Sequence, residues 1–180
     1  TTRYIWSNLS GSISNYSDSK SGSSFSVDLG LYYNKEITLL NRTSELSFGS
    51  HFSNIGGKIT YGSSKNLDFI PINLRFGSAL KTFIDQYNSI TIALDFNKLL
   101  VPTPPIYEKD NLGNYVMDPL TNKPKILKGK NPNRSVLSGM FSSFSDAPNG
   151  FLEELKEFTI SSGFEYWYRE MFALRGGYFF

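Results

Sequence analysis

The sequence predicts an all-β protein, an antiparallel transmembrane β-barrel of which this chain covers about seven strands. Three observations predict this class. Apolar and polar residues alternate with a period of two along several long segments. No segment approaches the roughly 18 consecutive apolar residues of a membrane helix. The polar positions between the apolar ones carry small and charged residues, which suits a polar barrel lumen with the apolar side turned to lipid.

The expected strands include 24–33, 46–52, 72–80, 90–97 and 158–166, with two more at the ends, 1–6 and 174–180. They are about ten residues long, which fits a tilted membrane strand better than the usual globular strand of about five or six. Bacterial single-chain barrels have even strand numbers, and lipid does not tolerate unpaired strand edges. We therefore expect residues 1–180 to be one partial outer-membrane β-barrel domain, whose remaining strands lie outside this chain or come from a partner.

The expected connections alternate between short and long. They are 10–21, 34–44, 61–70, 83–88, 101–154 and 168–170. Outer-membrane barrels have short periplasmic turns and long extracellular loops, so 10–21, 61–70 and 101–154 are expected outside the cell. Aromatic residues gather at the opposite strand ends, where amphipathic rings favour the membrane interface. These are Tyr32, Tyr33, Phe83, Tyr87, Tyr166, Trp167 and Tyr168. The alternative reading is that aromatic residues simply favour strands.

Two ion pairs are expected between neighbouring strands, inside the lumen. If a turn centres on Asp85, alternation places Arg75 opposite Asp95. A turn at 169–170 places Glu165 opposite Arg175 in the same way. A shift of the register by two residues would leave either pair diagonal.

The long connection 101–154 is the candidate partner-binding element. Its prolines exclude a regular central strand over 101–107, and a short helix is expected from Asn131 through Phe144. Connections of this length are usually functional or disordered. Candidate contacts are the apolar and aromatic residues that a free surface loop would not need, although they could instead cap the barrel rim. They are Pro104, Pro105, Tyr107, Met140, Phe141 and Phe144.

Composition argues against several other functions. The chain has no cysteine, and its formal net charge of +2 is too weak to indicate nucleic-acid binding. Its one histidine, His51, stands beside serines but is expected to point into the lumen, and no Gly-x-Ser-x-Gly elbow is present. No carboxylate cluster has the spacing of a metal site. We therefore expect no catalytic residues, no metal and no cofactor.

Five segments of the chain, in collinear order, resemble the PorV family, outer-membrane components of the type IX secretion system of Bacteroidetes. They are SNIGGKI at 53–59, PINLRFG at 71–77, DFNKLLVPTPP at 95–105, FSSFSDAP at 141–148, and EYWY at 165–168 followed by FALRGGYF at 172–179. The resemblance implies a complete barrel of roughly fourteen strands, similar to that of the FadL fatty-acid transporters. This chain looks like the middle and later part of such a barrel.

The resemblance implies a carrier without catalytic chemistry, integral to the bacterial outer membrane and in contact with its lipid. PorV-like proteins bind the C-terminal signal domain of secreted cargo at the large translocon barrel and pass the cargo to a cell-surface sortase and attachment complex. Two alternatives stay open. A FadL-like transporter of hydrophobic small molecules would need an apolar path, whereas the expected lumen is polar. A soluble β-sandwich adhesin would not need outward rows of Ile, Leu and Phe.

Overall fold

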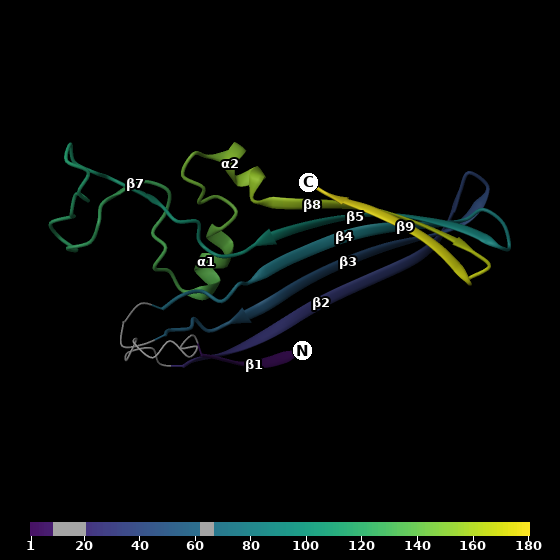
Figure 1. Ribbon diagram of the computed structural model, residues 1–180, viewed down its shortest axis with the longest axis horizontal. Helices are drawn as coiled ribbons and strands as arrows, with labels where there is room; N and C mark the ends of the chain where they lie inside the picture. Colours follow the sequence, from purple (N-terminus) through teal and green to yellow (C-terminus); the bar gives the residue numbers. More distant parts are fainter. Residues whose placement is uncertain (9–20, 62–66) are drawn as a thin grey trace.

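The protein forms one long antiparallel sheet with a large appendage at one end (Figure 1). The computed structural model describes residues 1–8, 21–61 and 67–180. The seven strands of the sheet are ordered β1-β2-β3-β4-β5-β8-β9. Their bounds are Thr2–Ser7, Gly22–Leu39, Arg42–Gly56, Asn73–Phe83, Asn88–Leu99, Phe158–Tyr168 and Phe172–Phe179. The all-β antiparallel prediction is confirmed.

Connections of two kinds join these strands, at opposite ends of the sheet (Figure 1). The turns after β2, β4 and β8 are short, whereas 57–72 and 100–157 are long. The segment 100–157 contains β6 (Ile106–Tyr107), β7 (Ile126–Lys128), α1 (Val136–Ser142) and α2 (Phe151–Lys156). Of the expected outer connections, 10–21 falls mainly outside the described residues. None of the described helices is long and apolar enough to cross a membrane.

The turn between β2 and β3 is much tighter than expected. Only Leu40 and Asn41 lie between the two strands, and both have positive φ, at 49° and 58°. This left-handed pair is the backbone of a two-residue hairpin turn, in which asparagine is favoured. The expected connection 34–44 is therefore wrong, because the ladder continues through its polar residues and pairs Glu36 with Glu45.

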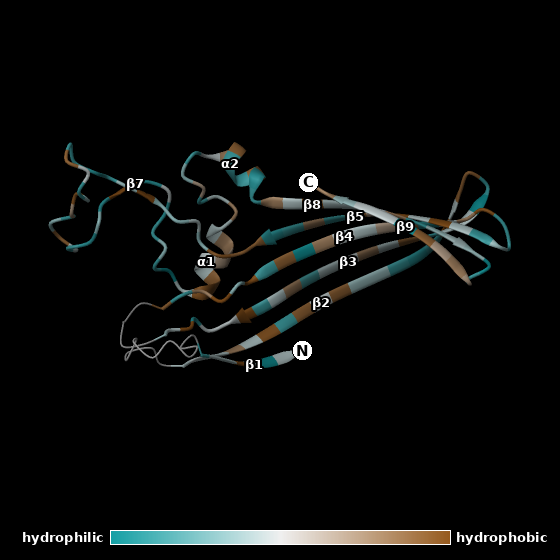
Figure 2. Ribbon diagram, viewed as in Figure 1, coloured by the Kyte–Doolittle hydropathy of each residue, from teal (hydrophilic) through white to brown (hydrophobic). Residues whose placement is uncertain are grey.

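The two faces of the sheet differ in chemistry, and the residues alternate along each strand (Figure 2). One face carries large apolar side chains that remain exposed: Leu29, Leu31, Phe48, Phe76, Ile92, Leu94, Phe164 and Leu174. On this face the rings of Phe76 and Phe96 stack at 5.0 Å between centroids. We call it the apolar face. The other, the polar face, carries small, hydrogen-bonding and charged residues, such as Asn34, which donates to Ser47 Oγ at 3.0 Å.

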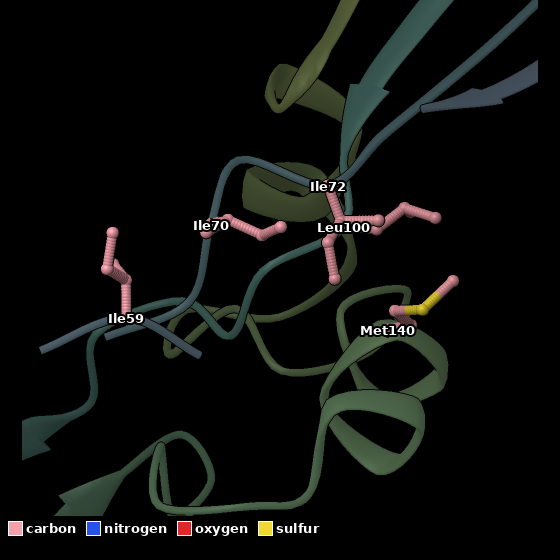
Figure 3. Packing of buried hydrophobic residues seen from close by; sticks show 5 residues of the cluster. All are labelled: Ile59, Ile70, Ile72, Leu100 and Met140. Carbon is pink, nitrogen blue, oxygen red and sulfur yellow. The ribbon is translucent and has the colours of Figure 1, made fainter. Parts of the chain in front are cut away.

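The buried apolar core is small and lies at the end of the sheet where the long connections meet (Figure 3). It consists of Ile59, Ile70, Ile72, Leu100 and Met140, all at most 7% exposed. These residues come from the segment 57–72, the position just after β5 and helix α1. The core therefore fixes the long connections against the strand ends, while most of the two broad faces of the sheet stays uncovered.

Candidate partner-binding site

The proline-rich start of the 100–157 segment is partly a packing element. Pro104 is exposed, but Pro105 is buried. A side chain at Gly129 would meet Pro105 Cβ at 3.3 Å, and Gly129 has a φ of +92°, a conformation that favours glycine. Tyr107 stands edge-on to Tyr115, with ring centroids 5.8 Å apart. Pro105 and Tyr107 thus stabilise the segment, whereas Pro104 is available for contact.

Residues 108–125 continue beyond the two-stranded sheet of β6 and β7 as a projecting arm. Asp110 closes its first turn by accepting from the backbone N–H of Asn114 at 2.8 Å and of Leu112 at 2.9 Å. These hydrogen bonds hold the pKa of the Asp110 carboxyl below its ordinary value. Leu112 and Leu120 are 87% and 95% exposed. The arm is thus an ordered projection with apolar tips.

Helix α1 begins later than expected and splits the predicted aromatic cluster. Its N-cap is Ser135, whose side chain accepts from the Ser138 N–H, because the Asn131–Asn133 stretch forms a separate Asx turn. Gly139 lies against the Phe69 ring so closely that a Cβ there would clash at 2.6 Å. With the helix packed in this way, Met140 lies in the core. Phe141 points away from the core and is 76% exposed.

Phe144 lies beyond α1, close to a buried ionic cluster that the sequence analysis missed. Lys98 Nζ donates to Glu154 Oε1 and to Glu157 Oε2, at 2.7 Å each, and lies 5.8 Å from the centre of the Phe144 ring. The Lys98 side chain is fully buried and that of Glu154 is 6% exposed. These contacts tie α2 to the end of β5. A lysine in the alternating apolar row of β5 was the signal that could have revealed the cluster.

Asp146 adds a third carboxylate near the cluster. Its Oδ2 accepts from the Thr103 N–H at 3.3 Å, while its Oδ1 is buried without a hydrogen-bond partner. Thr103 Oγ1 in turn donates to Glu157 at 2.8 Å. Burial raises the pKa of the Asp146 carboxyl above its ordinary value, and the charges of Glu154 and Glu157 act in the same direction. Thr103, near the start of the 100–157 segment, is therefore hydrogen-bonded to Asp146 and Glu157, near its end.

The two expected ion pairs differ in outcome. Glu165 lies directly opposite Arg175, and the Arg175 guanidinium donates to its carboxylate. Arg75 lies opposite Asn97 instead, and Asp95 lies opposite Gly77, so the expected direct opposition of Arg75 and Asp95 is wrong. The cause is the turn, in which Asp85 accepts from the N–H groups of Tyr87 and Asn88 and so begins the turn instead of centring it.

A hollow lies over the polar face at its short-turn end. Its volume is about 910 Å³, and Lys81, Phe83, Ser89 and Trp167 line it. In the described parts of the chain, no group of three His, Asp or Glu residues could hold a metal ion. The structure thus separates a polar hollow at the short-turn end from an ordered loop with exposed apolar residues at the other end, where the buried ionic cluster joins the loop to the sheet.

The family model described as type IX secretion system protein PorV matches residues 1–106, which include β1 to β5. No curated protein matches the chain.

Proposed function

Because the chain belongs to the PorV family of type IX secretion system proteins, we propose that it is a non-catalytic carrier, integral to the outer membrane. In this role it binds the C-terminal signal domain of secreted cargo at the large translocon barrel. It then delivers the cargo to the cell-surface sortase and attachment complex. The family match carries the proposal, and the structure supports it in two respects, the sheet faces and the 100–157 segment.

The faces of the sheet support a place in the membrane. Large apolar residues such as Leu31 in β2 and Ile92 in β5 are 80% and 56% exposed and belong to long strands of the same sheet. Water would make such a continuous apolar surface unfavourable, whereas lipid would cover it. The opposite face, with Arg75, Asp95 and the Glu165–Arg175 pair, then lines a polar lumen. A polar lining disfavours a FadL-like path for hydrophobic small molecules along these strands.

The 100–157 segment supports partner binding outside the cell, as the long connection of a partial barrel domain. Its exposed apolar side chains, Pro104 and Phe141 among them, are presented on an ordered framework. Ordered presentation lowers the entropy lost on docking, and aromatic residues are frequent anchors at interfaces. Of the candidate contacts, we assign Phe141 and Pro104 to the partner, and Pro105, Met140 and Tyr107 to the framework. Phe144 is 43% exposed and lies beside Lys98, so it could contact both the partner and the framework.

The test is co-purification of the tagged full-length protein in mild detergent, comparing Phe141→Ser with the control Leu120→Ser. Phe141→Ser should weaken translocon or cargo association by about 1 kcal/mol or more, because the aromatic side chain that would anchor the partner is lost. Heat-modifiable gel mobility should stay unchanged, because no strand is touched. Wild-type levels of both partners with Phe141→Ser would assign recognition to another part of the protein. A bound fatty acid with no protein partner, for the wild type, would favour the transporter.

A further inference from the structure

Helix α2 has its charged side buried and its apolar side exposed. Glu154 is 5% exposed, whereas Phe151 and Leu152 are each 74% exposed and Leu155 is 49% exposed. A helix on the surface of a water-soluble protein has the opposite arrangement, with its apolar stripe on the core. An exposed phenylalanine and two exposed leucines on six residues are favourable only where the surroundings are themselves apolar.

The ionic cluster holds the helix in this orientation. Along β5, Lys98 occupies the same alternating row as Ile92, Leu94 and Phe96, which is the row of the apolar face. Both carboxylates that bind Lys98 come from α2 or the residue after it. The helix therefore covers the last part of the apolar face, with the ion pairs enclosed between helix and sheet. The ammonium and carboxylates are shielded there from whatever covers the rest of that face.

The exposed side of α2 continues the apolar face at the level where a membrane would end. Strand β8, Phe158–Tyr168, begins just after the helix and carries Phe164 on that face. Its 11 residues at about 3.3 Å each, tilted by about 40°, span roughly 28 Å. This is close to the roughly 30 Å of the hydrocarbon core. The helix thus lies about one membrane thickness from the short turns.

We propose that α2 is a membrane-interface helix whose Phe151, Leu152 and Leu155 side chains contact lipid acyl chains on the side of the 100–157 segment. This inference rests on the proposed location of the protein in a membrane. The inverted burial of the helix and its continuity with the apolar face favour lipid over a protein partner. The exposed Lys156 can extend its ammonium group to the anionic headgroups above.

The experiment is depth-dependent fluorescence quenching of the full-length protein reconstituted alone into phospholipid vesicles. The chain has no cysteine, so a single environment-sensitive label can be placed at Leu152→Cys. Two positions serve as controls: Leu94→Cys, in the middle of the apolar face, and Leu120→Cys, on the projecting arm. Phospholipids with a nitroxide at a shallow acyl position report lipid contact, and iodide in the buffer reports water.

The label at Leu152 should be quenched by the shallow nitroxide lipid and should be several-fold less sensitive to iodide than the label at Leu120. Iodide sensitivity equal to that at Leu120 would overturn the inference, because the helix would then face water. So would the absence of quenching by either agent, because protein would then cover the helix. Lipid quenching at Leu94 but not at Leu152 would refute the proposal that α2 contacts lipid, and would leave the membrane location of the sheet supported. If Leu94 too lacks lipid contact, the proposed membrane location fails with it.

Discussion

Removing the ammonium group of Lys98 should release α2 from the sheet. In Lys98→Met the methylene stem is largely kept, but Glu154 is left 5% exposed without its cation. Breaking a buried ion pair in this way costs about 3 to 5 kcal/mol. Because α2 has only six residues, the protein avoids this cost by opening the helix, while the strand ladder stays intact. The disruption should therefore be local.

Amide hydrogen exchange, followed by mass spectrometry of peptides covering 150–157 and β4, measures this opening. Exchange over 150–157 should accelerate at least tenfold, since about 1.4 kcal/mol corresponds to a factor of ten. The β4 peptide should stay protected. Adding Glu154→Gln to Lys98→Met should recover part of the protection, because no buried charge remains at that position. Lys125→Met is the matched control, since its ion pair with Glu108 is solvent-exposed and should contribute little. Equal exchange over 150–157 in Lys98→Met and Lys125→Met would refute the reasoning.

Two further predictions concern the loop carboxyl and the topology. Burial raises the folded-state pKa of Asp146 above the unfolded-state value, so this group favours the folded loop at acid pH and loses that contribution as pH rises through the folded-state pKa. Asp146→Asn should therefore increase protease resistance of the loop at neutral pH, with a gain that disappears at acid pH; a pH-independent gain would contradict the assigned cause. Cysteines placed at Asn111 and Gln86, at opposite ends of the sheet, should label oppositely with an impermeant reagent on whole cells, Asn111 from outside. Labelling of both from outside would exclude the proposed orientation.

The strands were predictable because their pattern is set by a strong physical constraint. Each strand has one apolar and one polar face, so a period of two persists over many residues and survives interruptions such as Gly77. The end of β2 was not predictable in this way. Glu36 and its polar neighbours resemble a loop, yet backbone hydrogen bonds, which are independent of side-chain polarity, extend the strand to Leu39.

The register between β4 and β5 depended on a single turn. Asp85 lies in the middle of 83–88, which suggested that it is the midpoint of the hairpin turn. Its carboxylate instead accepts from the N–H groups of Tyr87 and Asn88, so Asp85 lies at the start of the turn. This local preference moves the centre by one residue and every cross-strand partner by two. Sequence alone gives both arrangements the same alternation, so only the turn geometry distinguishes them.

Helix α2 was missed because no local signal in its own sequence marks it. Six residues are too few for a helical period to emerge, and Gly150 at the N-cap offers no side-chain hydrogen bond. The apolar residues, which normally identify the buried side, lie on the exposed side here. Lys98 was visible as an exception in its row, but Glu154 and Glu157 come to it from a segment more than fifty residues away.

The direct adjacency of β5 and β8 makes the 100–157 segment an insertion within a β-hairpin. Each doubling of loop length costs only about 0.6 kcal/mol in closure entropy, so the segment can lengthen, shorten or be exchanged at little cost to the sheet. The partner specificity of the 100–157 segment can therefore change in evolution while the strands stay constant. Such exchange is limited at the two ends of the segment. There Lys98 of β5 and Glu157, which directly precedes β8, form an ion pair. A graft that keeps Lys98, Glu157 and the α2 residue Glu154 should preserve the buried ion pairs at the base of the hairpin.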